Sequence, residues 1–257
     1  MSHIPVHEDD VVSLIGRAQA RLRFPDLDFT DPWAEDVLTR LDLDPEPFDE
    51  VRLRAMTVRT IVIDSIARHF FQRHPAALAI ALFPGICTRF SRVDNGTLHW
   101  LELDRPSRVG LKCELYRTPD RHMVAACCSL ACNGWMRFVS GLQGAPVLLV
   151  LEGALLRASH EEVDAFLTNA AQHVPPGTEL VLDYDARHPL RPSSLDPRRA
   201  CLEIPSPGGP EARYPRLRFV PPAEYPPSLE RDLAGFHGVS RLFQGRGVPS
   251  VAHLRFT

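Results

Sequence analysis

Long hydrophobic runs, a strong net charge and paired cysteines are all missing from this sequence of 257 residues. No apolar stretch approaches the roughly 20 residues that a membrane-spanning helix needs, and residues 1–10 lack the basic start and apolar core of a signal peptide. The formal net charge is -3, and basic residues are spread along the chain, which gives no electrostatic reason to expect nucleic acid. We therefore expect a cytoplasmic protein that binds a small molecule, a partner protein or a second copy of itself.

The sequence also lacks the common local signatures of catalytic and metal sites. Its six cysteines form no C-x-x-C pair, so reduced and mostly buried thiols are expected in place of a metal site or a disulfide framework. It contains no G-x-x-x-x-G-K-[ST] phosphate loop, no G-x-S-x-G elbow and no H-E-x-x-H zinc motif. Among the scattered histidines, His188 and His237 are the candidate acceptor-site bases. The sequence assigns no catalytic residue.

Apolar segments alternate with helical patterns over the first 184 residues. The run 76–82 is too uniformly apolar for a half-exposed strand, so it predicts a core strand of a parallel sheet. A second strand is predicted to end at Asp104, and further strands are predicted at 122–127, 145–152, 178–184, 217–220 and 251–256. Helices are predicted at 8–24, 31–42, 51–73, 106–116 and 134–142, after the Ser159 capping box, and as a turn near Ser228. This alternation is typical of βαβ units in an α/β protein.

We expect one domain over residues 1–257, because no repeat or linker divides the chain. Within it, residues 1–75 form a helical cover and residues 76–184 a cofactor-binding core. Residues 185–215 are dense in proline, glycine and charge and too long for an ordinary connection, which leaves a substrate-facing flap or a disordered insertion as alternatives. Residues 216–257 supply the C-terminal strands.

Several short segments match the motifs of one protein family, both in their residues and in their order along the chain. They are Asp31-Pro32-Trp33-Ala34, Val58-Arg59-Thr60 with Asp64, Thr88 to Gly96, Trp100, Asp104, Pro106, Trp135, Glu152-Gly153, and Pro176-Gly177 before Asp183. Over roughly residues 15 to 185 the chain thus resembles the leucine carboxyl methyltransferase family, and within it the tetracenomycin-type polyketide O-methyltransferases.

This resemblance implies a class I methyltransferase-like (Rossmann-like) fold. Such a fold has a seven-stranded, mostly parallel sheet with an antiparallel C-terminal edge and an N-terminal helical cover. The resemblance also implies S-adenosylmethionine as cofactor, with Asp104 on the ribose and Arg59 on the carboxylate of the methionine tail. An exposed arginine on an amphipathic helix is the alternative for Arg59. The expected cofactor-binding residues are Arg59, Phe83, Gly85, Thr88, Arg89, Asp104, Ser129, Leu130 and Glu152.

The chain departs from the family pattern at the cofactor. Where the family has Leu-Gly-Ala-Gly, this chain has Leu82-Phe83-Pro84-Gly85, which places a ring where glycine allows close approach and removes one N–H. Ser129 stands where the family has an aspartate at the adenine edge, and serine has a shorter reach and no charge. Two explanations stay open. Either the protein is an O-methyltransferase of a carboxylate or hydroxyl with an adjusted pocket, or it has lost methyl transfer and serves as a metabolite-binding, partner-subunit or repurposed catalytic protein.

Overall fold

The computed structural model describes residues 7–116, 119–140, 142, 144–184, 214–232 and 250–257. The predicted flap at 185–215 therefore lies almost entirely outside the described residues. The predicted turn near Ser228 is helical up to Asp232, and its continuation lies outside them as well. No helix in the described ranges has both the length and the apolar character that crossing a bilayer requires.

One sheet of seven strands runs through the described part of the chain, in the order β3-β2-β1-β4-β5-β7-β6. The first five strands in this order are parallel, whereas β7 is antiparallel to both β5 and β6. The fold class expected from the sequence is thereby confirmed, including its antiparallel edge. The strands are β1 Leu78–Leu82, β2 His99–Asp104, β3 His122–Ala126, β4 Leu148–Leu151, β5 Glu179–Tyr184, β6 Leu217–Phe219 and β7 Ser250–Phe256.

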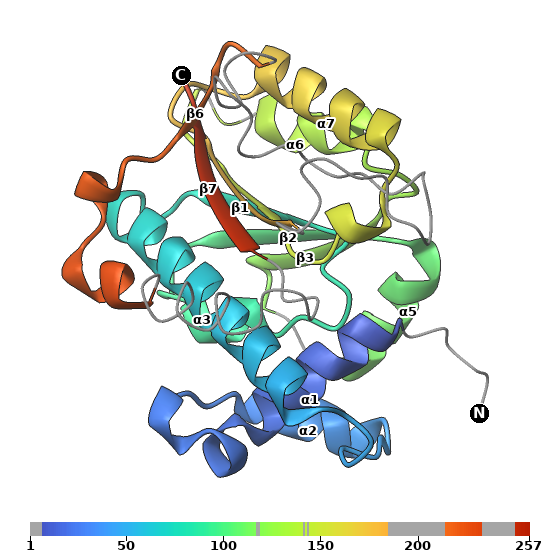
Figure 1. Cartoon of the computed structure of the whole chain (residues 1–257). Helices are drawn as coiled ribbons and strands as arrows, with labels where there is room; N and C mark the ends of the chain where they lie inside the picture. The colour runs from blue at the N-terminus through green and yellow to red at the C-terminus, as the bar shows by residue number, and fades with distance from the viewer. Residues whose placement is uncertain (1–6, 117–118, 141, 143, 185–213, 233–249) are drawn as a thin grey trace.

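The sheet is covered on both faces, which explains why β1 is apolar throughout. Alternate side chains of a strand point to opposite faces. Leu78 and Ile80 belong to the core on the side of α6 (Met136–Ser140) and α7 (His160–His173), while Ala79 and Ala81 belong to the core that contains α3 (Glu50–Arg73). Figure 1 shows α6 and α7 on one side of the strands and α3 on the other. All five residues of β1 are buried.

Local signals in the sequence set the helix ends. Asp31 and Asp49 cap α2 (Pro32–Arg40) and α3, each accepting a hydrogen bond from a backbone N–H of the first turn. Ser159 forms the predicted capping box at the start of α7. The expected helix at 134–142 is shorter than predicted, because it begins as the 3-10 turn η2 (Asn133–Trp135) and ends with α6. The remaining elements are α4 Arg89–Val93, α5 Pro106–Leu115, η1 Pro25–Leu27, η3 Leu155–Arg157 and η5 Pro222–Glu224.

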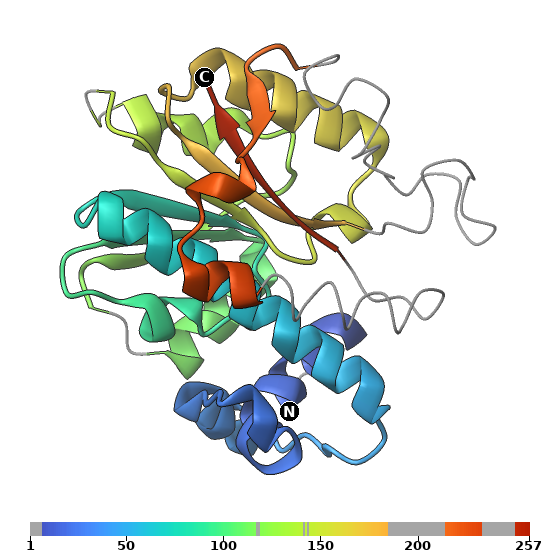
Figure 2. The ribbon, with the colours of Figure 1, turned by 60° about the vertical axis from the view of Figure 1, so that its left-hand side comes forward.

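The N-terminal helices α1 (Glu8–Arg23) and α2 cover the carboxyl end of the sheet beside α3 and α5. Leu14 of α1 and Val37 of α2 are fully buried in a core cluster with Ile86 and Leu111, which follow β1 and β2. Figures 1 and 2 show both helices on the α3 side of the molecule. This packing brings the first turn of α1 to the turn after β1, which is the edge where open α/β sheets bind ligands.

Candidate cofactor site

The chain turns sharply after β1, at Phe83, Pro84 and Gly85. Phe83 has a φ of 52° and Gly85 a φ of 59°. This left-handed conformation costs a residue with a side chain about 1–2 kcal/mol, whereas glycine adopts it readily. The Phe83 N–H donates to the Leu103 carbonyl at 2.7 Å. A Cβ on Gly85 would lie 2.5 Å from a carboxylate oxygen of Asp10. The turn is thus held by β2 and covered by α1, with glycine required at its tightest point.

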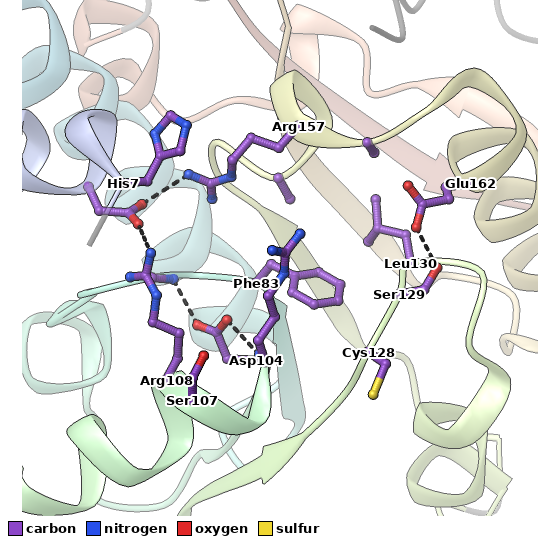
Figure 3. Close-up of a pocket in the computed structure, with 15 residues that line it drawn as sticks. His7, Phe83, Asp104, Ser107, Arg108, Cys128, Ser129, Leu130, Arg157 and Glu162 are labelled. Atoms are coloured by element: carbon purple, nitrogen blue, oxygen red, sulfur yellow. Dashed lines mark hydrogen bonds and ion pairs between the residues drawn. The ribbon is translucent and has the colours of Figure 1, made fainter. Parts of the chain in front are cut away.

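A cavity of about 340 Å³ lies at this turn (Figure 3). We call it the nucleoside cavity, for its size and its place at the carboxyl edge of the sheet. Small-molecule sites have volumes of roughly 300–1,000 Å³, so a ligand of nucleoside size fits. Its wall includes the predicted residues Phe83, Gly85, Asp104, Ser129 and Leu130. It also includes five residues that were not among the predicted site residues, namely Asp10, Arg105, Arg108, Arg157 and Glu162.

Asp104 ends β2 at the wall of the nucleoside cavity and is 4% exposed. One of its carboxylate oxygens accepts from the Arg105 N–H at 2.8 Å. The other accepts from the Gly85 N–H at 3.1 Å and pairs with Lys112 Nζ, also at 3.1 Å. The predicted ribose acid therefore lies on the cavity wall with three donors already around it.

Lys112 links Asp104 to a second buried carboxylate. Its Nζ lies 2.6 Å from Glu102, whose other oxygen lies 3.0 Å from His122 Nε2. Burial works to lower the pKa of Lys112, and the charges of Glu102 and Asp104 outweigh it, so the pKa lies above its usual value. Burial likewise works to raise the pKa of Glu102, but Lys112 and His122 hold it below its usual value. Both groups are charged at neutral pH.

Ser129 follows β3 and is engaged with a carboxylate from α7. Its hydroxyl donates to Glu162 at 2.5 Å and accepts from the Ala131 N–H at 3.1 Å. Glu162 also closes the α7 capping box by accepting from the Ser159 N–H. Figure 3 shows Ser129 and Glu162 together on one side of the cavity. Glu162 thus brings to this wall a negative charge that Ser129 lacks. The sequence marked Glu162 only as a capping residue, and no local signal indicated this second position.

Arg59 is buried, so the alternative of an exposed arginine on α3 is wrong. Its guanidinium pairs with Glu152 at 2.9 Å and with Asp183 at 2.7 Å. Arg89 pairs with the other oxygen of Glu152 at 2.6 Å and with Asp64 at 2.7 Å. The tail arginine expected from the family resemblance is therefore already paired with two carboxylates.

The ion pairs continue from Asp64 toward the N-terminal helices. Arg92 bridges Asp64 at 2.6 Å and Asp31 at 2.5 Å, and Arg17 pairs with Asp31 at 3.2 Å. Thr88 donates its hydroxyl to the same carboxylate of Asp31 at 2.5 Å. Four guanidinium groups and four carboxylates with little solvent exposure form this arginine network and balance in formal charge, and the half-exposed Arg68 adds a longer contact to Asp64 at 3.9 Å. The members of the arginine network are Arg17, Arg59, Arg89, Arg92, Asp31, Asp64, Glu152 and Asp183.

Protonation in this network follows from burial and its partners. Burial works to raise the pKa of Glu152, but Arg89 and Arg59 hold it well below its usual range. For Asp183 burial prevails over the charge of Arg59, and its pKa lies above the usual value. Arg89 keeps a pKa well above its ordinary value, because its carboxylate partners outweigh its burial. The guanidinium groups are thus permanently charged cations.

A second and much smaller cavity of about 20 Å³ lies beside Arg59 and Glu152. A space of this size is comparable to that of a single water molecule and is too small for an amino-acid tail. Asp10 and Arg157 line both cavities. Their side chains therefore stand between the nucleoside cavity and the buried arginine network.

The predicted site residues thus fall into three groups. Five of them line the nucleoside cavity, as described above, and Arg59 and Glu152 line the small cavity. Thr88 and Arg89 line neither cavity and belong to the arginine network and its hydrogen bonds. The candidate bases His188 and His237 lie outside the described residues.

In the described ranges, the side chains that could bind a metal ion do not cluster. No group of three or more histidine, cysteine or acidic side chains there could hold a metal ion. The five cysteines in these ranges are free thiols, of which Cys87 and Cys127 are buried. Cys113, Cys128 and Cys132 are exposed, so the expectation of mostly buried thiols is wrong. Cys113 lies on α5, and the other two follow β3, where the chain leaves the sheet.

Comparisons with known proteins agree on the fold. The chain is similar to a DUF574 family protein from Streptomyces avermitilis MA-4680, with 11% identity, a TM-score of 0.55, and coverage of 94% of this chain and 97% of that one. It is also similar to a protein from Thermobifida fusca YX whose assignment as a methyltransferase is itself provisional, with 12% identity, a TM-score of 0.52, and coverage of 95% and 94%. No protein-family model and no curated protein sequence matches the chain. The chain has the class I methyltransferase fold.

Proposed function

We propose that this chain is an S-adenosylmethionine-dependent O-methyltransferase related to the leucine carboxyl methyltransferase family, acting on a carboxylate or hydroxyl of a small biosynthetic metabolite. The observation that carries the proposal is the nucleoside cavity with Asp104, Ser129 and Leu130 on its wall. The class I methyltransferase fold supports it, since ligands of open α/β sheets bind at this edge.

The adenosine half of the cofactor fits the side chains of this cavity. A carboxylate can accept about four hydrogen bonds. Three donors already occupy positions on the Asp104 carboxylate, so about one position is left for a ribose hydroxyl. The adenine amino group is a donor, and the Glu162 carboxylate beside Ser129 provides a charged acceptor for it. Leu130 is buried next to them and supplies an apolar surface.

The chemistry requires positioning more than a dedicated nucleophile. S-adenosylmethionine, when bound, supplies a methyl group that its sulfonium already activates. The protein then has to hold the acceptor oxygen in line with that methyl and keep water away, and such positioning can supply much of the rate. That Arg59 holds the carboxylate of the methionine tail stays a prediction, and it requires Arg59 to exchange Glu152 or Asp183 for the ligand.

A second function is favoured by the small cavity beside Arg59. Its volume of about 20 Å³ leaves no room for an amino-acid tail, and both carboxylate partners of Arg59 are buried. A protein that binds a nucleoside without transferring a methyl group, as a metabolite-binding protein, a partner subunit or a repurposed catalyst, accounts for this closure.

Calorimetric titration with methylthioadenosine, S-adenosylhomocysteine and S-adenosylmethionine tests the nucleoside cavity. We expect binding of at least methylthioadenosine, and its loss in Asp104→Asn, because the amide keeps the shape but offers a weaker acceptor to the ribose. Asp94→Asn is the matched control, since Asp94 pairs with Arg121 at the surface. Absence of heat with all three ligands would refute both functions.

Methyl transfer is tested separately by incubating the protein with S-adenosylmethionine and a metabolite extract. The expected result is protein-dependent formation of S-adenosylhomocysteine together with a metabolite heavier by one CH₂ group. Nucleoside binding without either product would favour the second function over the first.

A further inference from the structure

Asp10 is held like a bound ligand at the junction of the two cavities. One of its carboxylate oxygens lies 2.8 Å from Arg108 Nη2 and the other 3.2 Å from Arg157 Nη1. The Asp10 side chain is 10% exposed. Three separate elements, α1, α5 and η3, meet at this contact, and Figure 3 shows the ends of Arg108 and Arg157 pointing toward one another. Two guanidinium groups that share one carboxylate form an anion-binding arrangement.

The Asp10 carboxylate also occupies the space above Gly85. An added Cβ at Gly85 would meet it at 2.5 Å, so the carboxylate lies against the turn whose residues line both cavities. Asp10 belongs to the first turn of α1. A movement of this one helical turn would free the junction and leave β1 and β2 in place.

Positive charge is in excess at this junction. The single carboxylate of Asp10 faces both Arg108 and Arg157, and the Nη1 of Arg108 is buried with no hydrogen-bond partner in the described part of the chain. The cavity wall carries two further acids, Asp104 beside Lys112 and Glu162 beside Ser129, and in the described part of the chain neither forms an ion pair with Arg108 or Arg157. A buried donor without a partner is costly, and a carboxylate that accepted from both Nη1 and Nη2 of Arg108 would relieve that cost.

The arginine network around Arg59 shows the opposite balance. Its four guanidinium groups already face four carboxylates, and the half-exposed Arg68 adds a positive charge beside Asp64, at 3.9 Å, so a ligand carboxylate at Arg59 would share a cation that two acids already hold. Space and charge thus both direct a ligand carboxylate to Arg108 and Arg157 and away from Arg59.

We propose that Asp10 stands in for the carboxylate of the ligand: when an adenosine with a carboxylate-bearing tail binds, that carboxylate replaces Asp10 between Arg108 and Arg157, and Arg59 keeps its ion pairs. The inference rests on the nucleoside cavity of the proposed function. It assigns Arg108 and Arg157 as tail-binding residues and Asp10 as a competitor that must leave.

Two ligands that differ in the tail test this assignment. S-adenosylhomocysteine carries the carboxylate, whereas methylthioadenosine shares the nucleoside and the sulfur but has no carboxylate. We expect Arg108→Gln and Arg157→Gln each to weaken S-adenosylhomocysteine about tenfold, as loss of a charge-assisted hydrogen bond does, and to change methylthioadenosine less than twofold. Asp10→Asn should strengthen S-adenosylhomocysteine several-fold, because the neutral amide competes less well for the arginines.

Arg121→Gln is the matched control, since it removes the same charge from a surface ion pair with Asp94 and Arg121 does not line the cavity. Unchanged methylthioadenosine binding shows that each variant is folded. The inference is overturned if both ligands weaken equally, or if S-adenosylhomocysteine is unaffected by Arg108→Gln and Arg157→Gln; in both cases nucleoside binding, and with it the proposed function, still stands. Failure of the wild type and of Asp10→Asn to bind either ligand overturns both.

Discussion

Replacing Lys112 by methionine should destabilise the protein far more than loss of a surface ion pair does. The Lys112 side chain is 2% exposed and lies between Glu102 and Asp104, which are 1% and 5% exposed. Methionine fills a similar volume but leaves two buried carboxylates without their cation. Removing one partner of a buried pair costs about 3–5 kcal/mol, so we expect a loss of this size in the free energy of unfolding.

Urea unfolding at neutral pH measures this loss, and a double-mutant cycle separates its cause. Glu102→Gln in the Lys112→Met background removes one of the uncompensated charges, so the double variant should regain about 1–3 kcal/mol relative to additivity. Arg121→Met is the control, because Arg121 pairs with Asp94 at 29% and 26% exposure and such pairs contribute about 0–1 kcal/mol. A loss below about 1 kcal/mol for Lys112→Met, or no recovery in the double variant, would refute the reasoning.

The remaining predictions concern acid stability and the turn after β1. Burial works to raise the pKa of Glu179, but the hydrogen bond and charge of His253, with help from arginines, bring it from 4.5 to about 2. The depressed pKa of Glu179 adds to the free energy of unfolding above pH 4.5, and this contribution, roughly 3 kcal/mol in all, is lost as the pH falls toward 2. In Glu179→Gln the melting temperature should therefore depend less on pH between 4.5 and 2 than in the wild type. An unchanged pH dependence would contradict the assignment. Gly85→Ala should cost about 2 kcal/mol in urea unfolding, through its positive φ and the contact with Asp10; an unchanged midpoint would contradict it. Phe83→Gly should tighten methylthioadenosine in calorimetry by removing a ring from the cavity and a strained φ; weaker binding would mean that the ring is part of the binding surface.

The parts of the fold that the sequence predicts well are those with a local cause. Continuous apolar runs indicated β1 and β4, and Asp31 and Ser159 indicated the starts of their helices. Some strand and helix boundaries in the structure differ from the predicted ones, and a local feature explains the difference. The strand predicted at 145–152 begins only at Leu148, after Pro146, which has no N–H to give to a sheet. These errors leave the parallel arrangement of β1 to β5 unchanged, because the alternation of strands and helices indicates parallel βαβ units.

The site was less predictable, because its contacts join residues far apart in the chain. Asp10 meets Arg108 and Arg157, which lie 98 and 147 positions away, and no local pattern around Asp10 distinguishes it from an acidic residue at a helix start. The positive φ of Phe83 is likewise set by the pairing of its N–H with Leu103 on β2. Sequence motifs correctly placed the acids and arginines near the carboxyl end of the sheet, but the partners of these side chains depend on tertiary packing.

The ion pairs of Asp104 and Arg59 weaken these two residues as evidence for a cofactor. The presence of Asp104 and Arg59 together invites the interpretation that a ligand requires both. Each has a structural partner, however: Asp104 pairs with Lys112, and Arg59 pairs with Glu152 and Asp183. Replacing either would leave a buried partner unpaired and destabilise the fold, so neither residue needs a ligand to explain it. Two features that the fold itself does not require point to a ligand, namely the nucleoside cavity and the pair of guanidinium groups, Arg108 and Arg157, that share the single carboxylate of Asp10 beside it.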